Sequence, residues 1–195
     1  MPSVTESDDR PILNLVGEKV ALGPLRRDLL PLYERWINDF DVVTMLGAQP
    51  RPITSESESD WFERAATSTE QIIFTIYERA TLRAIGTTDL RQIDHASRTA
   101  MFGILIGVKE LWGKGCGTET TRLMLEYAFH VLGLHNVVLS VYARNERGIR
   151  AYRRAGFREI GRRREAHRVG GQAEDIVFMD CLATEFERPP VKWNL

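Results

Sequence analysis

The stretch 111-LWGKGCGTETTRLMLEYAFHVLGL-134 joins three glycines at alternate positions to an apolar segment with helical spacing. Glycine has no Cβ, so it reaches positive φ easily and lets a ligand lie against the main chain. The first N–H groups of the following helix lack partners within the helix, and the helix dipole favours an anion at that end. The stretch therefore predicts an anion site, for which a phosphate is the natural ligand.

Three other interpretations of this loop can be compared with the sequence. A tight connection between a strand and a helix is the plainest. A P-loop would close on a lysine followed by serine or threonine, whereas Gly117 is followed by Thr118 and Glu119. A dinucleotide fold would place the glycines after the first strand and an acidic residue after the next, whereas the next strand here ends in Val141 and Tyr142. The loop alone leaves a phosphate site and a simple connection open.

The composition is that of one globular domain. The chain has 195 residues, of which 43% are hydrophobic and 27% charged. A formal net charge of -1 gives no indication of nucleic-acid or membrane-surface binding. The two cysteines are too few for a disulfide framework, and neither a signal peptide nor a membrane-spanning run is recognisable. We therefore expect a cytoplasmic protein.

The pattern of apolar residues predicts a single mixed α/β domain with a mostly antiparallel sheet and the order βααβββαβαββ. The first 12 residues are expected to be disordered, residues 13–183 to form the domain, and residues 184–195 to be a tail without regular structure, because Pro189 and Pro190 fit no regular element. Ser57 or Ser59 is expected to cap the second helix. The expected strands are 19–25, 71–77, 82–90, 99–107, 136–142, 157–165 and 173–181, and the expected helices are 27–39, 57–68, one that ends before Gly133, and 145–156.

Two motifs in sequence order resemble the GNAT superfamily of N-acetyltransferases. They are "WGKGCGTE" at 112–119 and "NERGIRAYRRAGF" at 145–157, and the resemblance extends from Lys19 to Cys181. The family's phosphate-loop pattern, Gln/Arg-x-x-Gly-x-Gly/Ala, falls on 112–117. Trp112 replaces its first polar residue, as is typical of the branch of ribosomal-protein-alanine and spermidine acetyltransferases. The resemblance implies a GNAT-like fold with a splayed central strand pair flanked by helices, and acetyl-CoA as cosubstrate.

The resemblance also implies roles for individual residues. Backbone N–H groups near Ile104 and Ile106 would hold the pantetheine arm and polarise the thioester carbonyl. Asn145 would bond the cofactor as well as cap its helix. Tyr152 would be the general acid, although plain packing in the core also explains a tyrosine at that position. The cofactor's pyrophosphate would be bound by the loop, whose cofactor-binding residues would be Trp112, Gly113, Lys114, Gly115, Cys116, Gly117 and Thr118.

The general base and any metal are less evident. Histone-type members of the family carry a glutamate early on the splayed strand, where this chain has Ala100, Met101 and Phe102. Asp89, Glu110 or a chain of waters could serve instead, although an acidic residue at a strand end is more often a solvated surface group. No cluster of residues has metal-ligand spacing, so we expect no metal.

The acceptor is expected to be a primary amine, such as a protein N-terminus, a polyamine or another small amine. Its site should lie between the 40–54 loop and the closing hairpin, because loops usually carry specificity. Asp39, Asp41, Glu56 and Glu58 near that loop favour a cationic partner, although a run of charge is usually a solvated face. A module that binds CoA without turnover is the alternative function. The sequence leaves open whether the protein forms a homodimer.

Overall fold

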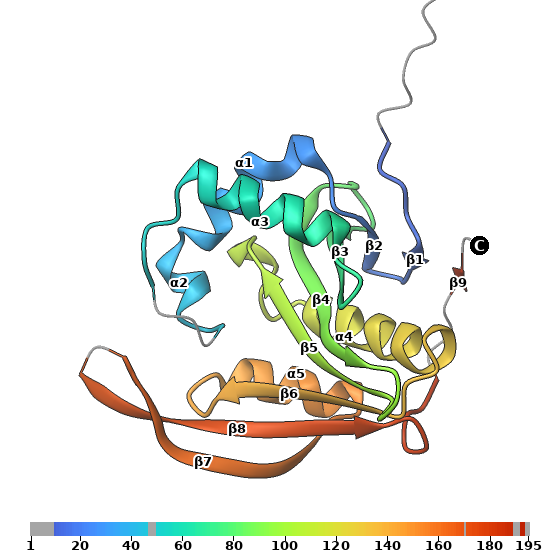
Figure 1. Ribbon diagram of the computed structural model, residues 1–195, viewed down its shortest axis with the longest axis vertical. Helices are drawn as coiled ribbons and strands as arrows, with labels where there is room; N and C mark the ends of the chain where they lie inside the picture. Colours follow the sequence, from blue (N-terminus) through green and yellow to red (C-terminus); the bar gives the residue numbers. More distant parts are fainter. Residues whose placement is uncertain (1–9, 47–49, 170, 189–191, 194–195) are drawn as a thin grey trace, which may run out of the picture.

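The computed structural model describes residues 10–46, 50–169, 171–188 and 192–193, which fold around one mixed sheet (Figure 1). The strands are β1 (Leu15–Val16), β2 (Val20–Pro24), β3 (Gln71–Glu78), β4 (Ala84–Asp94), β5 (Thr99–Ile106), β6 (Asn136–Tyr142), β7 (Arg158–Val169), β8 (Gln172–Leu182) and β9 (Lys192–Trp193). The helices are α1 (Leu30–Ile37), α2 (Phe40–Val43), α3 (Ser55–Thr67), α4 (Cys116–Glu126) and α5 (Glu146–Ala155), with short turns η1 (Arg27–Leu29), η2 (Lys109–Leu111) and η3 (Tyr127–Val131).

The sheet opens between its two central strands. In the described residues the strand order is β7-β8-β6-β5-β4-β3-β2-β1-β9, and only β5 and β6 run parallel. Their ladder joins Thr99–Met101 to Asn136–Val138 and stops there. Beyond it β5 stays paired with β4 up to Ile106, while β6 stays paired with β8 up to Tyr142. The two strands therefore diverge, which confirms the predicted splayed pair.

Alternation along the strands gives the sheet two different faces. Thr75 of β3 lies on one face, where its hydroxyl is 2.6 Å from the Tyr33 hydroxyl of α1. Phe74 lies on the other face and packs edge-on against Tyr127, which follows α4. Phe102 of β5 likewise packs edge-on against Tyr152 of α5. Helices α1 and α3, which contact each other, thus cover one face, and α4 and α5 cover the other.

Local sequence signals explain where the helices begin and end. The Asn145 carboxamide accepts a hydrogen bond of 2.9 Å from the Gly148 N–H, so Asn145 is the predicted cap of α5. Gly156 ends that helix at a φ of 116°. The expected caps of α3 were wrong: the helix begins earlier, and the Thr54 hydroxyl accepts from the Ser57 N–H at 3.2 Å.

The predicted order of long elements is confirmed, and several short elements were missed. Strand β1 pairs with β2, and α2 lies inside the predicted 40–54 loop. The tail, which was expected to lack regular structure, contributes β9, which pairs with β1. Elements of two to four residues are too short for a hydrophobic period to be recognised. The first nine residues of the expected disordered segment, together with Pro189 and Pro190, lie outside the described part of the chain.

Candidate active site

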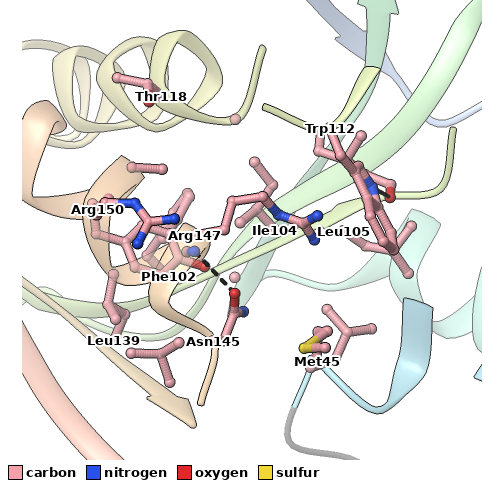
Figure 2. A pocket seen from close by; sticks show the side chains of 18 of the residues that line it. Met45, Phe102, Ile104, Leu105, Trp112, Thr118, Leu139, Asn145, Arg147 and Arg150 are labelled. Carbon is pink, nitrogen blue, oxygen red and sulfur yellow. Dashed lines mark hydrogen bonds between the residues drawn. The ribbon is translucent and has the colours of Figure 1, made fainter. Parts of the chain in front are cut away.

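A cavity of about 490 Å³ occupies the gap between the diverging halves of β5 and β6 (Figure 2). Its wall includes Thr87 and Leu105, which share a row of the sheet with Thr75 and therefore lie on the α1/α3 face. It also includes Phe102 and Ile104, which lie on the α4/α5 face. The cavity therefore passes through the sheet, and two molecules that enter from opposite faces can meet in it.

The edge of β5 offers backbone groups to this cavity. The Gly107 N–H donates to the Ile85 carbonyl at 2.9 Å. In an antiparallel pair only every second residue hydrogen-bonds to the neighbouring strand, so the residues of β5 that bond to β4 are those two and four positions before Gly107. The intervening residues Ile104 and Ile106 direct their backbone groups toward β6. The Trp112 indole N–H donates a hydrogen bond to the Ile106 carbonyl at 2.8 Å. The Ile104 amide and the Ile106 N–H therefore face the cavity, where a bound chain with amides can pair with them.

The glycine loop lies at one end of the cavity. Gly113 and Gly115 have positive φ values of 77° and 91°, which side chains adopt with strain. A Cβ at Gly113 or Gly117 would meet nothing within 4 Å, so both positions leave the backbone open to a ligand. Gly117 and Thr118 lie in the first turn of α4, whose unpaired N–H groups favour an anion.

Two residues of the predicted site are not in the described cavity wall. Lys114 is exposed and lies outside the described wall. Its backbone carbonyl accepts a hydrogen bond from the Lys19 ammonium group at 2.9 Å. Cys116 is buried beneath the loop, and burial raises the pKa of its thiol. The Cys116 thiol is therefore part of the core packing, and no nucleophilic role follows from its position.

A carboxylate that the sequence did not single out for a role holds the loop to the sheet. Glu119 of α4 accepts hydrogen bonds from the backbone N–H groups of Glu18, Lys19 and Val20 at 2.9, 2.7 and 2.7 Å. Glu18 and Lys19 lie in the turn between β1 and β2, and Val20 begins β2. Glu119 and the Lys19 ammonium group together connect the glycine loop to this turn, about a hundred residues away in sequence.

Sequence reasoning also missed a row of three arginines. Arg147, Arg150 and Arg154 of α5 all line the cavity, and Arg147 stacks over the Trp112 ring at 4.0 Å (Figure 2). Their spacing of three and four residues, which places them on one helical face, was a signal that could have revealed them. With the first turn of α4, they make this end of the cavity suited to several phosphate charges.

Helix α5 also contributes the predicted general acid. Tyr152 lines the cavity, where its ring packs edge-on against Phe102 at 6.2 Å and against Phe157 at 6.1 Å. Burial raises the pKa of the Tyr152 phenol to about 12, so the hydroxyl keeps its proton through the neutral and alkaline range. Asn145 lines the cavity too, at the start of the same helix.

The opposite end of the cavity has a different character. Val42, Met45 and Leu46, from the predicted 40–54 loop, give it an apolar wall. Asp89 also lines it and forms an ion pair of 2.9 Å with Arg91.

Two other expectations concern this end of the cavity, the candidate base Glu110 and the closing hairpin. Glu110, the other candidate base, is exposed on η2 and outside the described wall. The hairpin β7–β8 contributes no residue to that wall. It is connected indirectly, because Arg144 lies 3.8 Å from the Glu174 carboxylate of β8 and donates to the Thr44 carbonyl at 2.8 Å.

Comparison with known families explains this combination of a splayed strand pair and a glycine loop. The family model described as "Acetyltransferase (GNAT) domain" matches residues 19–158. The chain belongs to the GNAT acetyltransferase family. This assignment confirms the resemblance inferred from the loop and from the 145–157 motif, and it makes the chain an acetyl-CoA-dependent N-acetyltransferase.

This GNAT acetyltransferase is similar to several named N-acetyltransferases. It is 36% identical over 61% of its length to the "Probable N-acetyltransferase YjcK" of Bacillus subtilis, of which the match spans 66%. It is 31% identical over 88% of its length to the spermidine N(1)-acetyltransferase of Vibrio cholerae, of which the match spans 97%. The crystal structure of spermidine N-acetyltransferase from Vibrio cholerae with CoA and spermine has the same fold, with a TM-score of 0.80 at 24% identity, covering 87% of this chain and 98% of that one.

The residues of this GNAT acetyltransferase fit acetyl-CoA. The arginine row and the glycine loop suit its phosphates, and the open edge of β5 suits its two amides. In the described ranges no group of three or more His, Cys, Asp or Glu could hold a metal ion. No helix among the described residues is long and apolar enough to cross a membrane.

Proposed function

We propose that this GNAT acetyltransferase transfers the acetyl group of acetyl-CoA directly to a primary amine while both are bound. The observation that carries the proposal is the single cavity walled by residues from both faces of the sheet. It lets an amine from the α1/α3 face reach a thioester held on the α4/α5 face without a covalent enzyme intermediate. The buried, non-nucleophilic Cys116 agrees with direct transfer.

The chain's own groups would support each charge change of the reaction. Acetyl-CoA supplies an acetyl group activated as a thioester. Backbone N–H groups at Ile104 and Ile106 would stabilise the negative charge that develops on the carbonyl oxygen. The Tyr152 hydroxyl would donate its proton to the departing sulfur, since its raised pKa keeps it protonated.

The proton lost by the amine would leave on the acceptor side. Asp89 lines that end of the cavity, and its ion pair with Arg91 holds the carboxylate in place. We assign to Asp89 the transfer of this proton to solvent, because Glu110 does not line the described cavity wall. The amine must lose a proton at this stage whichever acceptor is bound.

A polyamine or another small amine is the acceptor class we favour over a protein N-terminus. The spermidine acetyltransferases among the relatives support it. The test is release of free CoA thiol with a panel of monoamines, diamines, polyamines and N-terminal peptides. Thiol release with at least one amine, together with a matching acetylated product, is expected.

The alternative is a module that binds CoA without turnover. It would raise the melting temperature with CoA, yet release no thiol with any amine of the panel. That outcome would replace the enzymatic proposal.

A further inference from the structure

A second cavity lies beside the first, on the α1/α3 face of the sheet. It has a volume of about 170 Å³ and shares Thr87 and Leu105 with the larger cavity. We call it the aromatic pocket. Its wall consists of Tyr33, Trp36, Ile37, Glu58, Trp61, Thr87 and Leu105.

Three aromatic rings line the aromatic pocket. The Tyr33 ring lies 5.9 Å from the Trp36 ring and 6.1 Å, edge-on, from the Trp61 ring. The position of Trp36 depends on Gly107, because a Cβ there would lie 2.1 Å from the indole ring. The Tyr33 hydroxyl is held by Thr75 of β3. The rings are therefore fixed in place by α1, α3 and the sheet.

One carboxylate stands among these rings without a partner. Glu58 of α3 is only 8% exposed, and no described residue gives it a hydrogen bond or an ion pair. Burial and the nearby charge of Glu34 raise the pKa of Glu58, so the folded protein disfavours its ionised form. The Glu58 carboxylate lines the cavity, where a bound cation would favour its ionised form and pair with it.

Three other acidic residues near the same segment are differently placed. Asp39 and Asp41 both pair with Lys109, at 2.8 and 2.9 Å. Glu56 is exposed to solvent. Only Glu58 of these four combines burial with a free carboxylate and an adjoining cavity.

We propose that the aromatic pocket binds a second ammonium group of the acceptor, so that the preferred substrate is an amine with two or more cationic centres. Aromatic faces attract alkylammonium groups, and Glu58 supplies the counter-charge. The first amine would react in the larger cavity while the second is held near Glu58, since the two cavities share part of their walls. This inference rests on the proposed amine acetylation.

The kinetic test compares straight-chain α,ω-diamines of three to eight carbons with monoamines of the same length. One range of diamine lengths is expected to exceed its matched monoamines in kcat/KM by about tenfold or more, since hydrogen bonds to charged groups are individually strong. Glu58→Gln should raise KM for these diamines by about tenfold and leave the monoamines within about twofold. Glu56→Gln, an exposed site on the same helix, should change neither.

A binding measurement separates failure of this inference from failure of the proposed function. Calorimetry with protein saturated with CoA, where no acetyl group is present, should show the best diamine binding more tightly than its monoamine, and Glu58→Gln should remove the difference. This holds even if no amine is acetylated. Equal affinities for diamine and monoamine in the parent protein, or an equal loss for both in a folded Glu58→Gln variant, would overturn the inference.

Discussion

The two ends of the large cavity differ in whether backbone groups or side chains form most of the wall. The cofactor end uses mostly backbone, namely the glycines, the first turn of α4 and the unpaired edge of β5, and adds the arginine row of α5. The acceptor end uses side chains from α2, the turn after it and β4, and the adjoining aromatic pocket adds side chains from α1 and α3. These elements are distant in sequence. Backbone groups are the same in every residue, so they can recognise an invariant cosubstrate, whereas side chains can be exchanged to change the acceptor.

This difference predicts that the two ends can be damaged separately. The largest effect is expected for Gly117→Val, whose side chain would occupy the open space before the loop without adopting a strained φ. CoA affinity should fall by about a hundredfold, equivalent to two hydrogen bonds to charged groups. Calorimetry with CoA measures it. Gly161→Val, another open site without positive φ, on β7, is the control. Unchanged affinity in the folded variant would mean that the loop is only a connection.

The attachment of the loop to the sheet is tested by Glu119→Gln. The amide retains one acceptor oxygen and turns the other into a donor that faces backbone N–H groups. Stability should fall by about 1–2 kcal/mol, discounted for partial exposure, which is a factor of about 5 to 30 in the folding equilibrium. The melting temperature should drop by about 2 to 8 °C. Glu110→Gln, on the exposed η2 turn, should not change it; equal effects from both variants would contradict the role of Glu119.

Tyr152 lines the cavity and packs against Phe102 of β5. Tyr152→Phe should lower kcat by about tenfold or more and leave KM for acetyl-CoA little changed, because the proton is transferred only in the transition state. Steady-state thiol release at saturating substrates is the measurement. Tyr127→Phe, which removes a hydroxyl outside the described cavity wall, is the control. A kcat within about twofold of the parent would show that Tyr152 is only a packing residue.

The smallest expected effect is on the pH dependence of the rate, in which ionisation of the Tyr152 phenol should not be visible below about pH 10. Because burial raises the Tyr152 pKa to about 12, the phenol stays protonated as the pH rises through 10 and is lost as a donor only near its folded pKa. The rate should therefore rise as more of the amine is deprotonated, with no falling limb from Tyr152 below about pH 10. A pH–rate profile checks this. A falling limb near pH 9 that disappears in Tyr152→Phe would contradict the raised pKa.

Much of the cofactor end was predictable because its signals are local. The glycines, the helix after them and the Asn145 cap lie within short stretches, where glycine spacing and capping chemistry are visible directly. The arginine row of α5 was equally local and could have been found from its helical spacing. The pairing of Glu119 with the backbone of residues 18–20 could not be predicted, because it joins segments about a hundred residues apart.

The sequence by itself determined the order of the long elements, the glycine loop and the family. Only the tertiary structure decided which of four neighbouring acidic residues is buried without a partner. Asp39, Asp41, Glu56 and Glu58 are all acidic residues in the sequence. In the structure Lys109 pairs with the first two, solvent surrounds the third, and the fourth lines a pocket together with Trp36 and Trp61. A side chain's charge belongs to the residue, whereas its burial and its partners depend on how distant segments pack.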